Sequence, residues 1–422
     1  MQKPLIIITF LLLSLNLFAE ISKDIIDVEA KVIEWRRDFH QHPELSNREF
    51  RTAKIIAEHL KSLGLEVRTG VAHTGVTGFL KGALPGPTIA LRADMDALPV
   101  TEQVDLPFAS KQTTTYRGET VGVMHACGHD THVAMLMGAA EVLAKNKANL
   151  KGSVLFVFQP AEEGAPEGER GGAEMMLSEG IFSQYKPEVA FGIHITSSIP
   201  SGVAGYHAGP AMAAVDTFDL TVHGKQTHGS RPWGGIDPIV ASAQIINAVQ
   251  TIVSRKVDVT KAAAVVSFGA IKGGIRSNII PDKVEMVGTI RNFDMEIRDM
   301  IHENLRQIVE NTARASGATA ELVIHSGYPV TVNNPELTKK MLPSLQAVFG
   351  DQSVIDMGMI TGAEDFSYYA QQVPGFFFYL GVTPHEIDYR TAPTNHSPLF
   401  YVEESNLING VKAFVQLVQD YE

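Results

Sequence analysis

The chain has 422 residues, of which 45% are hydrophobic and 19% are charged, which is an ordinary composition for a folded protein. This length is too great for one compact core, so we expect two domains. The formal net charge of −12 keeps the protein soluble and argues against a partner with a phosphate backbone, so we expect no nucleic-acid partner.

The first residues differ in character from the rest of the chain. Lys3 supplies one positive charge, and residues 5–18 form an apolar run with few polar interruptions. This pattern is typical of a secretory signal peptide, here residues 1–19, with Ala19 as the last residue before cleavage. Because the run is shorter than the roughly 20 residues of a spanning helix, we expect an exported protein, periplasmic or secreted, with no stable membrane span after cleavage. An uncleaved anchor is the alternative.

Apolar periodicity predicts alternating helices and strands in the first half of the chain. Residues 29–63 carry apolar side chains at helical spacing, and Gly64 ends that pattern. Residues 129–145 predict a second helix. Three almost continuously apolar runs predict strands buried on both faces, which favours an α/β fold with a mainly parallel sheet. These strands are residues 87–93, 153–158 and 189–193.

Residues 212–326 follow a different pattern. Their strands and amphipathic helices occur in the order β-α-β-β-α-β, which is that of the split βαβ unit. We therefore predict a ferredoxin-like α+β lid domain at 212–326, inserted into the larger α/β domain formed by residues 20–211 and 327–422. Its exposed sheet edge offers a surface for a homodimer. The predicted helices are 238–253 and 295–316, and the predicted strands are 217–222, 262–271, 283–290 and 319–325.

Metal-competent side chains directly follow each of the three predicted strands of the larger domain. Asp94 and Asp96 follow the first, Glu162 and Glu163 the second, and His194 the third. Ligand sites in open α/β sheets lie at the carboxyl ends of strands, so these side chains are expected to converge. The alternatives are a turn or helix cap for either aspartate and a solvated face for the glutamates.

The only cysteine, Cys127, lies in a cluster of histidines and an aspartate at residues 125–132, and His396 lies in a proline-bounded loop near the C-terminus. With one cysteine no intramolecular disulfide can form. Thiolate, imidazole and carboxylate together are the ligands of zinc and related divalent ions. A histidine by itself is more often a satisfied polar residue, but the five segments together favour a metal centre, which would also explain a free thiol in an exported protein.

Five stretches of the sequence resemble the metal-dependent aminoacylase and hippurate hydrolase family, whose relatives include auxin-conjugate amidohydrolases and zinc carboxypeptidases with a lid domain. The resemblance runs from about Val32 to the C-terminus. The stretches are Arg-Arg-Asp-Phe-His-Gln-His-Pro-Glu-Leu at 36–45, Arg-Ala-Asp-Met-Asp-Ala-Leu-Pro at 92–99, Cys-Gly-His-Asp at 127–130, Gln-Pro-Ala-Glu-Glu-Gly at 159–164 and Gly-Ala-Glu-Asp-Phe at 362–366.

The resemblance implies a centre of two divalent metal ions, Zn²⁺ or Mn²⁺. Cys127 would bridge the ions, His129 and His194 would hold one of them, and Glu163 and His396 would hold the other. The implied reaction is cleavage of the amide bond of an N-acyl amino acid by a metal-activated water.

The resemblance also implies roles for residues that bind no metal. Glu162 would be the general base that takes a proton from the water and returns it to the leaving amine. Asp94 would have a catalytic role, physically by orienting a ligand imidazole. In the lid, His228 would stabilise the oxyanion, and Asn278 and Arg276 would bind a carboxylate or carbonyl of the substrate. A surface role is the alternative for Arg276.

Two other functions stay open. One is a dipeptidase or carboxypeptidase of the same chemistry. The other is a binding protein with a decayed active site, but the intact Glu162 and the full set of ligands argue against it. Serine hydrolase chemistry is disfavoured because no Gly-x-Ser-x-Gly motif occurs. The chain departs from the family after His194, where residues 195–200 stand in place of an early aromatic and proline. We expect this segment to be a loop that affects substrate preference.

Overall fold

The computed structural model describes the backbone of residues 4–421 and the side chains of residues 22–421. The predicted signal peptide, residues 1–19, therefore lies outside the residues whose side chains are described. Among the described residues, no helix combines the length and apolar character needed to cross a membrane.

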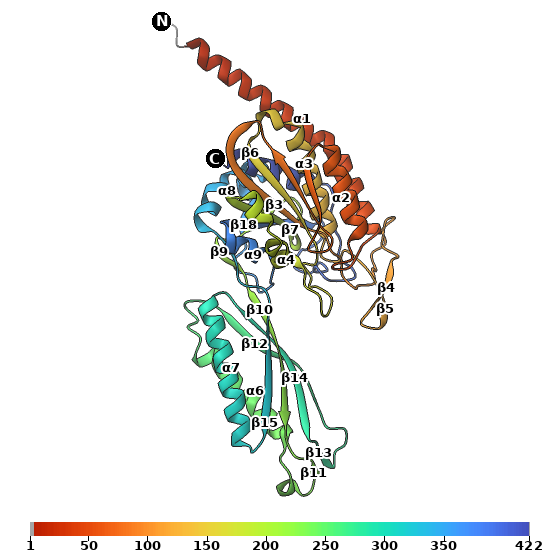
Figure 1. The fold of residues 1–422 in the computed structure, drawn as a ribbon, viewed down its shortest axis with the longest axis vertical. Coiled ribbons are helices and arrows are strands. Elements are labelled where there is room, and N and C mark those ends of the chain that lie inside the picture. The colour runs from red at the N-terminus through yellow and green to blue at the C-terminus, as the bar shows by residue number, and fades with distance from the viewer. Residues whose placement is uncertain (1–3, 422) are drawn as a thin grey trace. The chain divides into compact units, whose positions relative to one another are not determined.

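The chain forms two compact units (Figure 1). Unit 1 comprises Met1–Ala208, Asn333–Met357 and Tyr369–Glu422, and unit 2 comprises Gly209–Val332 and Gly358–Tyr368. Residues 209–211 and 327–332, which were predicted to belong to the larger domain, lie in unit 2. Segment 358–368, which was also predicted to belong to the larger domain, lies in unit 2 as well. It does so because Ile360 forms a bridge with Met212 and its N–H donates to the carbonyl of Ala211 at 2.9 Å.

An eight-stranded sheet forms the centre of unit 1, in the order β1-β2-β6-β3-β7-β18-β8-β17. The four central strands β6, β3, β7 and β18 run parallel to one another, so the predicted mainly parallel sheet is confirmed. The bounds are β1 Glu66–Val71, β2 Gly75–Lys81, β3 Leu84–Asp94, β6 Lys151–Gln159, β7 Val189–Pro200, β8 Ala204–Tyr206, β17 Val354–Asp356 and β18 Gly375–Thr383. Strand β18 is buried along its whole length and was not predicted.

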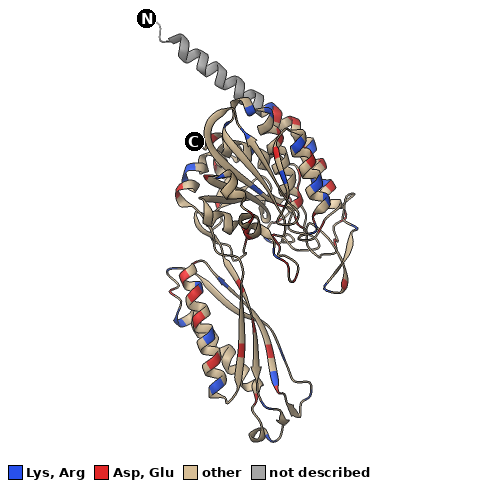
Figure 2. Ribbon diagram, in the orientation of Figure 1, with Lys and Arg blue, Asp and Glu red and all other residues tan. Residues whose placement is uncertain are grey.

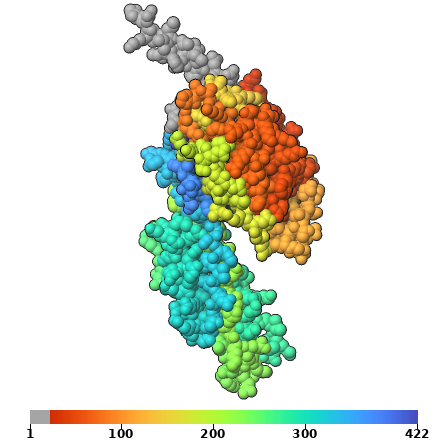
Figure 3. All heavy atoms as spheres, in the orientation of Figure 1, coloured from red at the N-terminus to blue at the C-terminus, as the bar shows by residue number. Residues whose placement is uncertain are grey.

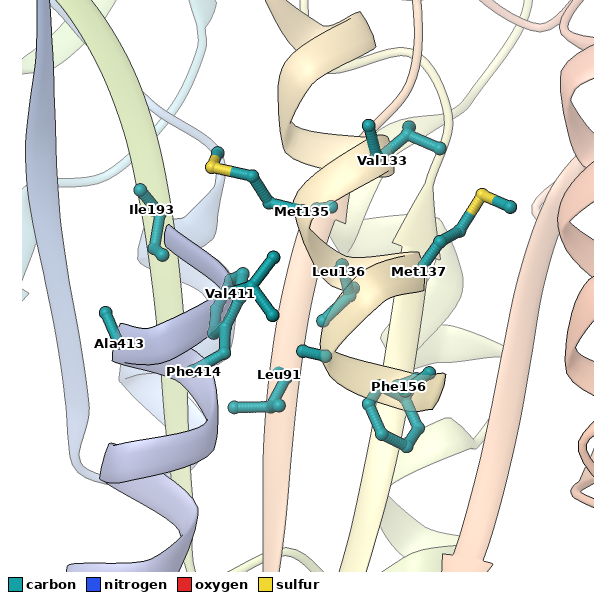
Figure 4. Packing of buried hydrophobic residues seen from close by; sticks show 14 of the residues in the cluster. Leu91, Val133, Met135, Leu136, Met137, Phe156, Ile193, Val411, Ala413 and Phe414 are labelled. Atoms are coloured by element: carbon teal, nitrogen blue, oxygen red, sulfur yellow. The ribbon is translucent and has the colours of Figure 1, made fainter. Parts of the chain in front are cut away.

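Helices pack against this sheet and build the main core. Figure 4 shows apolar side chains of α3 meeting those of α10 and of strands β3, β6 and β7. Helix α3 spans His129–Lys145, the bounds predicted from sequence. The other helices are α1 Pro4–Gln41, α2 Phe50–Ser62, α4 Gly172–Ser178, α5 Ile181–Tyr185, α8 Pro335–Phe349, α9 Phe366–Gln372 and α10 Leu407–Asp420, and a β4–β5 hairpin spans Thr113–Tyr116 and Glu119–Gly122.

The helical pattern predicted over residues 29–63 is interrupted. Helix α1 ends at Gln41 and α2 starts at Phe50, with an irregular segment at 42–49 between them. Pro43 lies in this segment, and proline supplies no N–H while also disfavouring helix at the residue before it. Apart from Pro43, Leu45 is the only apolar residue between Phe39 and Phe50, so the apolar periodicity lapses here, and the apolar residues on either side were interpreted as one helical pattern.

Unit 2 is built on a four-stranded antiparallel sheet in the order β12-β14-β10-β15, with α6 and α7 packed on its apolar face. In Figure 3 its surface is formed by green and cyan residues, and Figure 2 shows acidic and basic residues interleaved along α7. The bounds are β9 Gly209–Met212, β10 Ala214–His223, β11 Thr227–His228, α6 Pro238–Arg255, β12 Ala264–Gly273, β13 Ile279–Ile280, β14 Lys283–Asn292, α7 Met295–Ala315 and β15 Thr319–Ser326, with β16 Thr331–Asn333 pairing with β9.

Candidate metal centre

Three parallel strands deliver the carboxylates and one histidine to the same edge of the sheet. Strand β3 ends at Asp94, which lies opposite Gln159 at the end of β6. Glu162 and Glu163 therefore begin the turn that leaves β6 beside Asp94. Strand β7 carries His194 and continues to Pro200 alongside β18, so the expected loop at 195–200 is wrong. Backbone pairing with β18 extends the strand where the side-chain pattern had suggested that it ended.

A tight turn brings Cys127 and His129 to the same place. Gly128 between them has a φ of +92°, and a Cβ added there would lie 2.1 Å from Cδ1 of Ile195. Only glycine fits both the left-handed backbone and this close approach. The turn therefore presses the start of α3 against β7, next to His194.

The sulfur of Cys127 lies among the imidazoles. Its Sγ is 3.4 Å from Nε2 of His194 and 3.3 Å from Nε2 of His396. Nε2 of His396 also lies 3.1 Å from Oε1 of Glu163. Ligand atoms of Cys127, His129 and His194 all lie within 4.8 Å of one another, and the same holds for Cys127, Glu163 and His396. The five predicted ligands thus form two groups that share one sulfur.

Hydrogen bonds behind the histidines leave their Nε2 atoms available. Nδ1 of His194 donates to the carbonyl of Ile195 at 2.6 Å, and Nδ1 of His129 donates to Oδ1 of Asp96 at 3.2 Å. Among the described residues, the buried Nε2 of His129 has no hydrogen-bond partner. Metal-binding histidines have this arrangement, in which the second nitrogen is held by an acceptor. The donor set and its orientation therefore fit divalent ions.

The electrostatics of the cluster also suit a cation. Burial, reinforced by the carboxylates of Glu163 and Glu162, raises the pKa of the Cys127 thiol well above its usual range. Burial disfavours the charged form of His129, but Asp94 and Asp96 outweigh it and raise the pKa of that histidine to about 10. In both residues the nearby carboxylates raise the pKa, and a bound cation would neutralise this negative charge.

Asp96 organises both sides of the cluster. Besides contacting His129, its carboxylate accepts hydrogen bonds from the backbone N–H of Glu162 at 3.1 Å and of Glu163 at 3.0 Å. The hydroxyl of Ser46 donates to it at 2.7 Å. Asp96 was expected to lie near the site but was given no role in it, because a turn cap explained it equally well. Its position two residues after Asp94 at a strand end was the available signal.

Asp94 contacts a histidine that was not among the predicted metal ligands. Its Oδ1 lies 2.5 Å from Nδ1 of His132, and its Oδ2 accepts a hydrogen bond from Arg92 at 2.6 Å. Nε2 of His132 in turn accepts from the N–H of Ile195 at 2.9 Å. Asp94 therefore orients His132, which belonged to the sequence cluster at 125–132 but had no assigned role. Nε2 of His129 is 3.6 Å from Oδ2 of Asp94.

Asn395 joins three of the segments that carry predicted ligands. Its side-chain amide donates to the carbonyls of Cys127 at 3.1 Å and Ile195 at 3.2 Å, and its oxygen accepts from the N–H of Ser197 at 3.2 Å. The next residue, His396, has a φ of +72° and donates its N–H to the carbonyl of Ala126. The sequence signal for this role was only its place before His396.

Glu162 lies within the cluster with its carboxylate close to the ligand positions. The residue is buried, and its Oε2 is 3.9 Å from Nε2 of His129. His129, Glu162 and Glu163 form a further group of converging ligand atoms. A carboxylate in this position is able to accept a proton from a water molecule held among the same groups.

The predicted lid residues lie together in unit 2. His228 on β11 pairs with Ile279 on β13, and the N–H of Gly229 donates to the carbonyl of Asn278 at 2.8 Å. The carbonyl of Arg276 accepts from the N–H of Ile279 at 3.2 Å. His228, Asn278 and Arg276 are all exposed on this unit.

The chain belongs to peptidase family M20/M25/M40, whose pattern matches residues 90–420. It is 44% identical over 405 residues to thermostable carboxypeptidase 1 of Saccharolobus solfataricus, covering 96% of this chain and 98% of that protein. It is 38% identical over 381 residues to the N-acetyl-L-cysteine deacetylase of Bacillus subtilis, covering 90% and 86%. It also resembles the crystal structure of a dinuclear metal binding peptidase of the M20 family from Bacillus subtilis, with a TM-score of 0.76, 35% identity, and coverage of 93% and 98%.

These similarities confirm the predicted family, the α/β fold and the hydrolase class. The chain is therefore an enzyme of the family that hydrolyses carbon–nitrogen bonds.

Proposed function

We propose that this chain hydrolyses the amide bond of small N-acyl amino acids at two divalent ions. The proposal rests chiefly on one observation: the Sγ of Cys127 is shared by two converging groups of ligand atoms. Cys127, His129 and His194 would hold one ion, and Cys127, Glu163 and His396 the other. The thiolate and imidazoles favour zinc, with manganese as the alternative.

The groups of the chain divide the catalytic work. Divalent ions bound at these residues would polarise the amide carbonyl and lower the pKa of a water molecule. Glu162 accepts the proton of the attacking water and delivers it to the nitrogen of the leaving amine, so one carboxylate serves as base and then as acid. Asp94 and Asp96 hold His132 and His129 in fixed orientations, which keeps the geometry of the site constant.

The exposed residues of unit 2 complete the proposal. His228 would stabilise the negative charge that develops on the carbonyl oxygen, and Asn278 and Arg276 would hold the substrate carboxylate or carbonyl. The expected results are a lower kcat for His228→Ala and a higher KM for Asn278→Ala and Arg276→Ala. An unchanged KM for Arg276→Ala would identify it as a surface residue.

The test combines metal analysis with a substrate panel. Purified protein should contain about two divalent ions per chain, and it should release free amino acid from N-acetyl and N-benzoyl amino acids. Similarity to a carboxypeptidase favours dipeptides as the second candidate class. Comparing kcat/KM for matched N-acyl amino acids and dipeptides separates the two. If the protein hydrolysed neither class of substrate, the proposal would be contradicted.

Two further properties belong to the same proposal. Residues 1–19 act as an export signal, which predicts a mature N-terminus near Glu20 and an extracytoplasmic enzyme. N-terminal sequencing of protein from fractionated cells tests this.

The chain also forms a homodimer through unit 2, where β12 is an edge strand with Val265 and Ile271 exposed. A monomeric mass in light scattering would contradict it.

A further inference from the structure

The segment that follows α1 runs past the metal centre without supplying a ligand. Leu45 forms a parallel bridge with Ala97, and the N–H of Ala97 donates to the carbonyl of Glu44 at 2.8 Å. Residues 44–49 therefore lie against the chain just beyond β3. The motif at 36–45 was recognised from sequence, but the proposed reaction gives no role to the residues that end it.

Glu49 is the charged residue of this segment that lies deepest. It is 0% exposed, and both of its carboxyl oxygens accept hydrogen bonds. Oε1 accepts a hydrogen bond from the backbone N–H of Ala161 at 3.0 Å, and Oε2 accepts from the hydroxyl of Thr74 at 2.5 Å. Burying a carboxyl group is costly unless it is hydrogen-bonded, so this position needs these two donors.

The partner of Glu49 has an unusual backbone conformation. Ala161 has a φ of +54°, in the left-handed region that residues with a Cβ rarely adopt. Pro160 before it has no N–H, so Ala161 supplies the first backbone donor after β6. Such conformations persist only where the surroundings hold them. The hydrogen bond from the N–H of Ala161 to Glu49 is a contact that holds the left-handed conformation of Ala161.

Two buried carboxyl groups thus accept hydrogen bonds from three successive backbone N–H groups in the turn at residues 161–163. Glu49 accepts from the N–H of Ala161, and Asp96 accepts from the N–H groups of Glu162 and Glu163. The first of these bonds sets the direction in which the chain leaves β6. The next two residues are the proposed base and a proposed metal ligand, so a rotation at Ala161 would move both.

We propose that Glu49 is a positioning residue, which holds Ala161 in its left-handed conformation and thereby places the carboxylates of Glu162 and Glu163. This inference rests on the proposed function, because those two carboxylates gain their roles from it. Burial and the carboxylate of Asp96 raise the pKa of Glu49 to about 8, which makes a neutral glutamine a close replacement. A glutamine keeps an oxygen for Ala161 and offers an amide to the hydroxyl of Thr74.

The test compares Glu49→Ala with Glu49→Gln in the metal-loaded full chain. Glu58→Ala is the matched control, since Glu58 is on α2, the helix that begins directly after Glu49, and its side chain is 66% exposed. Hydrogen exchange of a peptide spanning residues 159–165 reports the bond at Ala161, and kcat and KM are measured on the best N-acyl amino acid. We expect Glu49→Ala to speed exchange at least about tenfold and to lower kcat by roughly 10- to 100-fold with little change in KM. Glu49→Gln and Glu58→Ala should resemble the wild type.

Wild-type exchange and kcat in Glu49→Ala would overturn the inference, and so would equal damage from glutamine and alanine. If Glu49→Ala does not fold, Thr74→Val provides a milder test, because it removes the hydroxyl that orients the Glu49 carboxyl. We then expect faster exchange at Ala161 and a kcat several-fold lower, and no change in either would overturn the inference. Hydrogen exchange is measured without substrate. If the wild type hydrolysed no substrate of the panel, the proposed function would be rejected, but the exchange rates at Ala161 would still test the role of Glu49.

Discussion

The Nδ1–H of His129 donates a hydrogen bond to the carboxylate of Asp96 at 3.2 Å. The same carboxylate holds the backbone of Glu162 and Glu163, so one buried side chain connects the start of α3 to the turn after β6. These elements carry three of the groups proposed for metal binding and proton transfer. Their relative placement therefore depends on a residue that would not itself bind metal.

Replacing Asp96 should consequently weaken metal binding. In Asp96→Ala the imidazole of His129 loses its acceptor and two backbone N–H groups are left unpaired. We expect the affinity for divalent ions to fall by roughly 10- to 100-fold. Competition titration with a chromophoric chelator measures this, with exposed Asp258 changed to alanine as the control. Wild-type affinity in Asp96→Ala would contradict the role assigned to this carboxylate.

The two adjacent glutamates should behave differently when replaced. Glu162→Ala removes the proposed base and should retain normal metal content while kcat falls by roughly 10²- to 10⁴-fold. Glu163→Ala removes a proposed ligand and should lose bound metal. Elemental analysis and steady-state kinetics on both variants distinguish these outcomes. Unchanged turnover in Glu162→Ala would exclude the mechanism.

The single thiol offers a test that needs no substrate. A sulfur bound to metal is shielded as thiolate, whereas removal of metal by a chelator should release it for reaction with a disulfide reagent. We expect Cys127 to be unreactive in loaded protein and to react after chelation, more rapidly as the pH is raised, because burial and the nearby carboxylates hold the pKa of the free thiol above its usual range.

Chelation should also lower the melting temperature, because ions at 100 times their Kd contribute about 2.7 kcal/mol to the folded state. Cys127→Ser should show a smaller drop in melting temperature on chelation. Equal thiol reactivity with and without the chelator would mean that the sulfur does not bind metal.

The sequence allowed prediction of those parts of the centre that carry local signals. Strand ends followed by carboxylates or histidine led to Asp94, Glu162 and His194, since strands of one parallel sheet deliver their carboxyl ends to one edge. The helix at 129–145 was predicted with its observed bounds because the polar cluster at its start and the apolar residues along its length lie in one short stretch of sequence. These signals lie within a few residues of the groups they identify.

The supporting hydrogen bonds were not predictable in the same way. Asn395 donates to the carbonyl of Cys127 across 268 positions, and Glu49 accepts from Ala161 across 112. Backbone acceptors and donors exist at almost every residue, so such a bond leaves no pattern in the sequence. The interruption at 42–49 was missed for a different reason, because Pro43 and the lapse in apolar spacing around it were not interpreted as the end of a helix.

Unit 2 contains a buried carboxylate that makes its stability depend on pH. Asp216 accepts hydrogen bonds from Nε2 of His302 at 2.6 Å and from Arg298, and the N–H of Gly327 donates to it at 3.1 Å. Burial raises the pKa of this carboxyl, but the bonds from His302 and Arg298 outweigh burial and lower the pKa to about 2. An unfolded aspartate has a pKa near 3.9, so the folded state favours the charged form.

The stabilisation from Asp216 should therefore be complete above about pH 4 and should be lost as the pH falls from about 4 to about 2. Asp216→Asn removes the charge, so this variant should be less stable than the wild type at pH 7, and the difference should shrink as the pH is lowered through that window. Hydrogen exchange of peptides from α7 measures the stability of unit 2 at pH 7, 4 and 3 after correction for intrinsic rates. Asp219→Asn is the control, since the side chain of Asp219 is 60% exposed on the same strand. A difference between wild type and Asp216→Asn that stays constant, or that grows as the pH falls, would show that the carboxylate is not stabilised by its partners in the folded state.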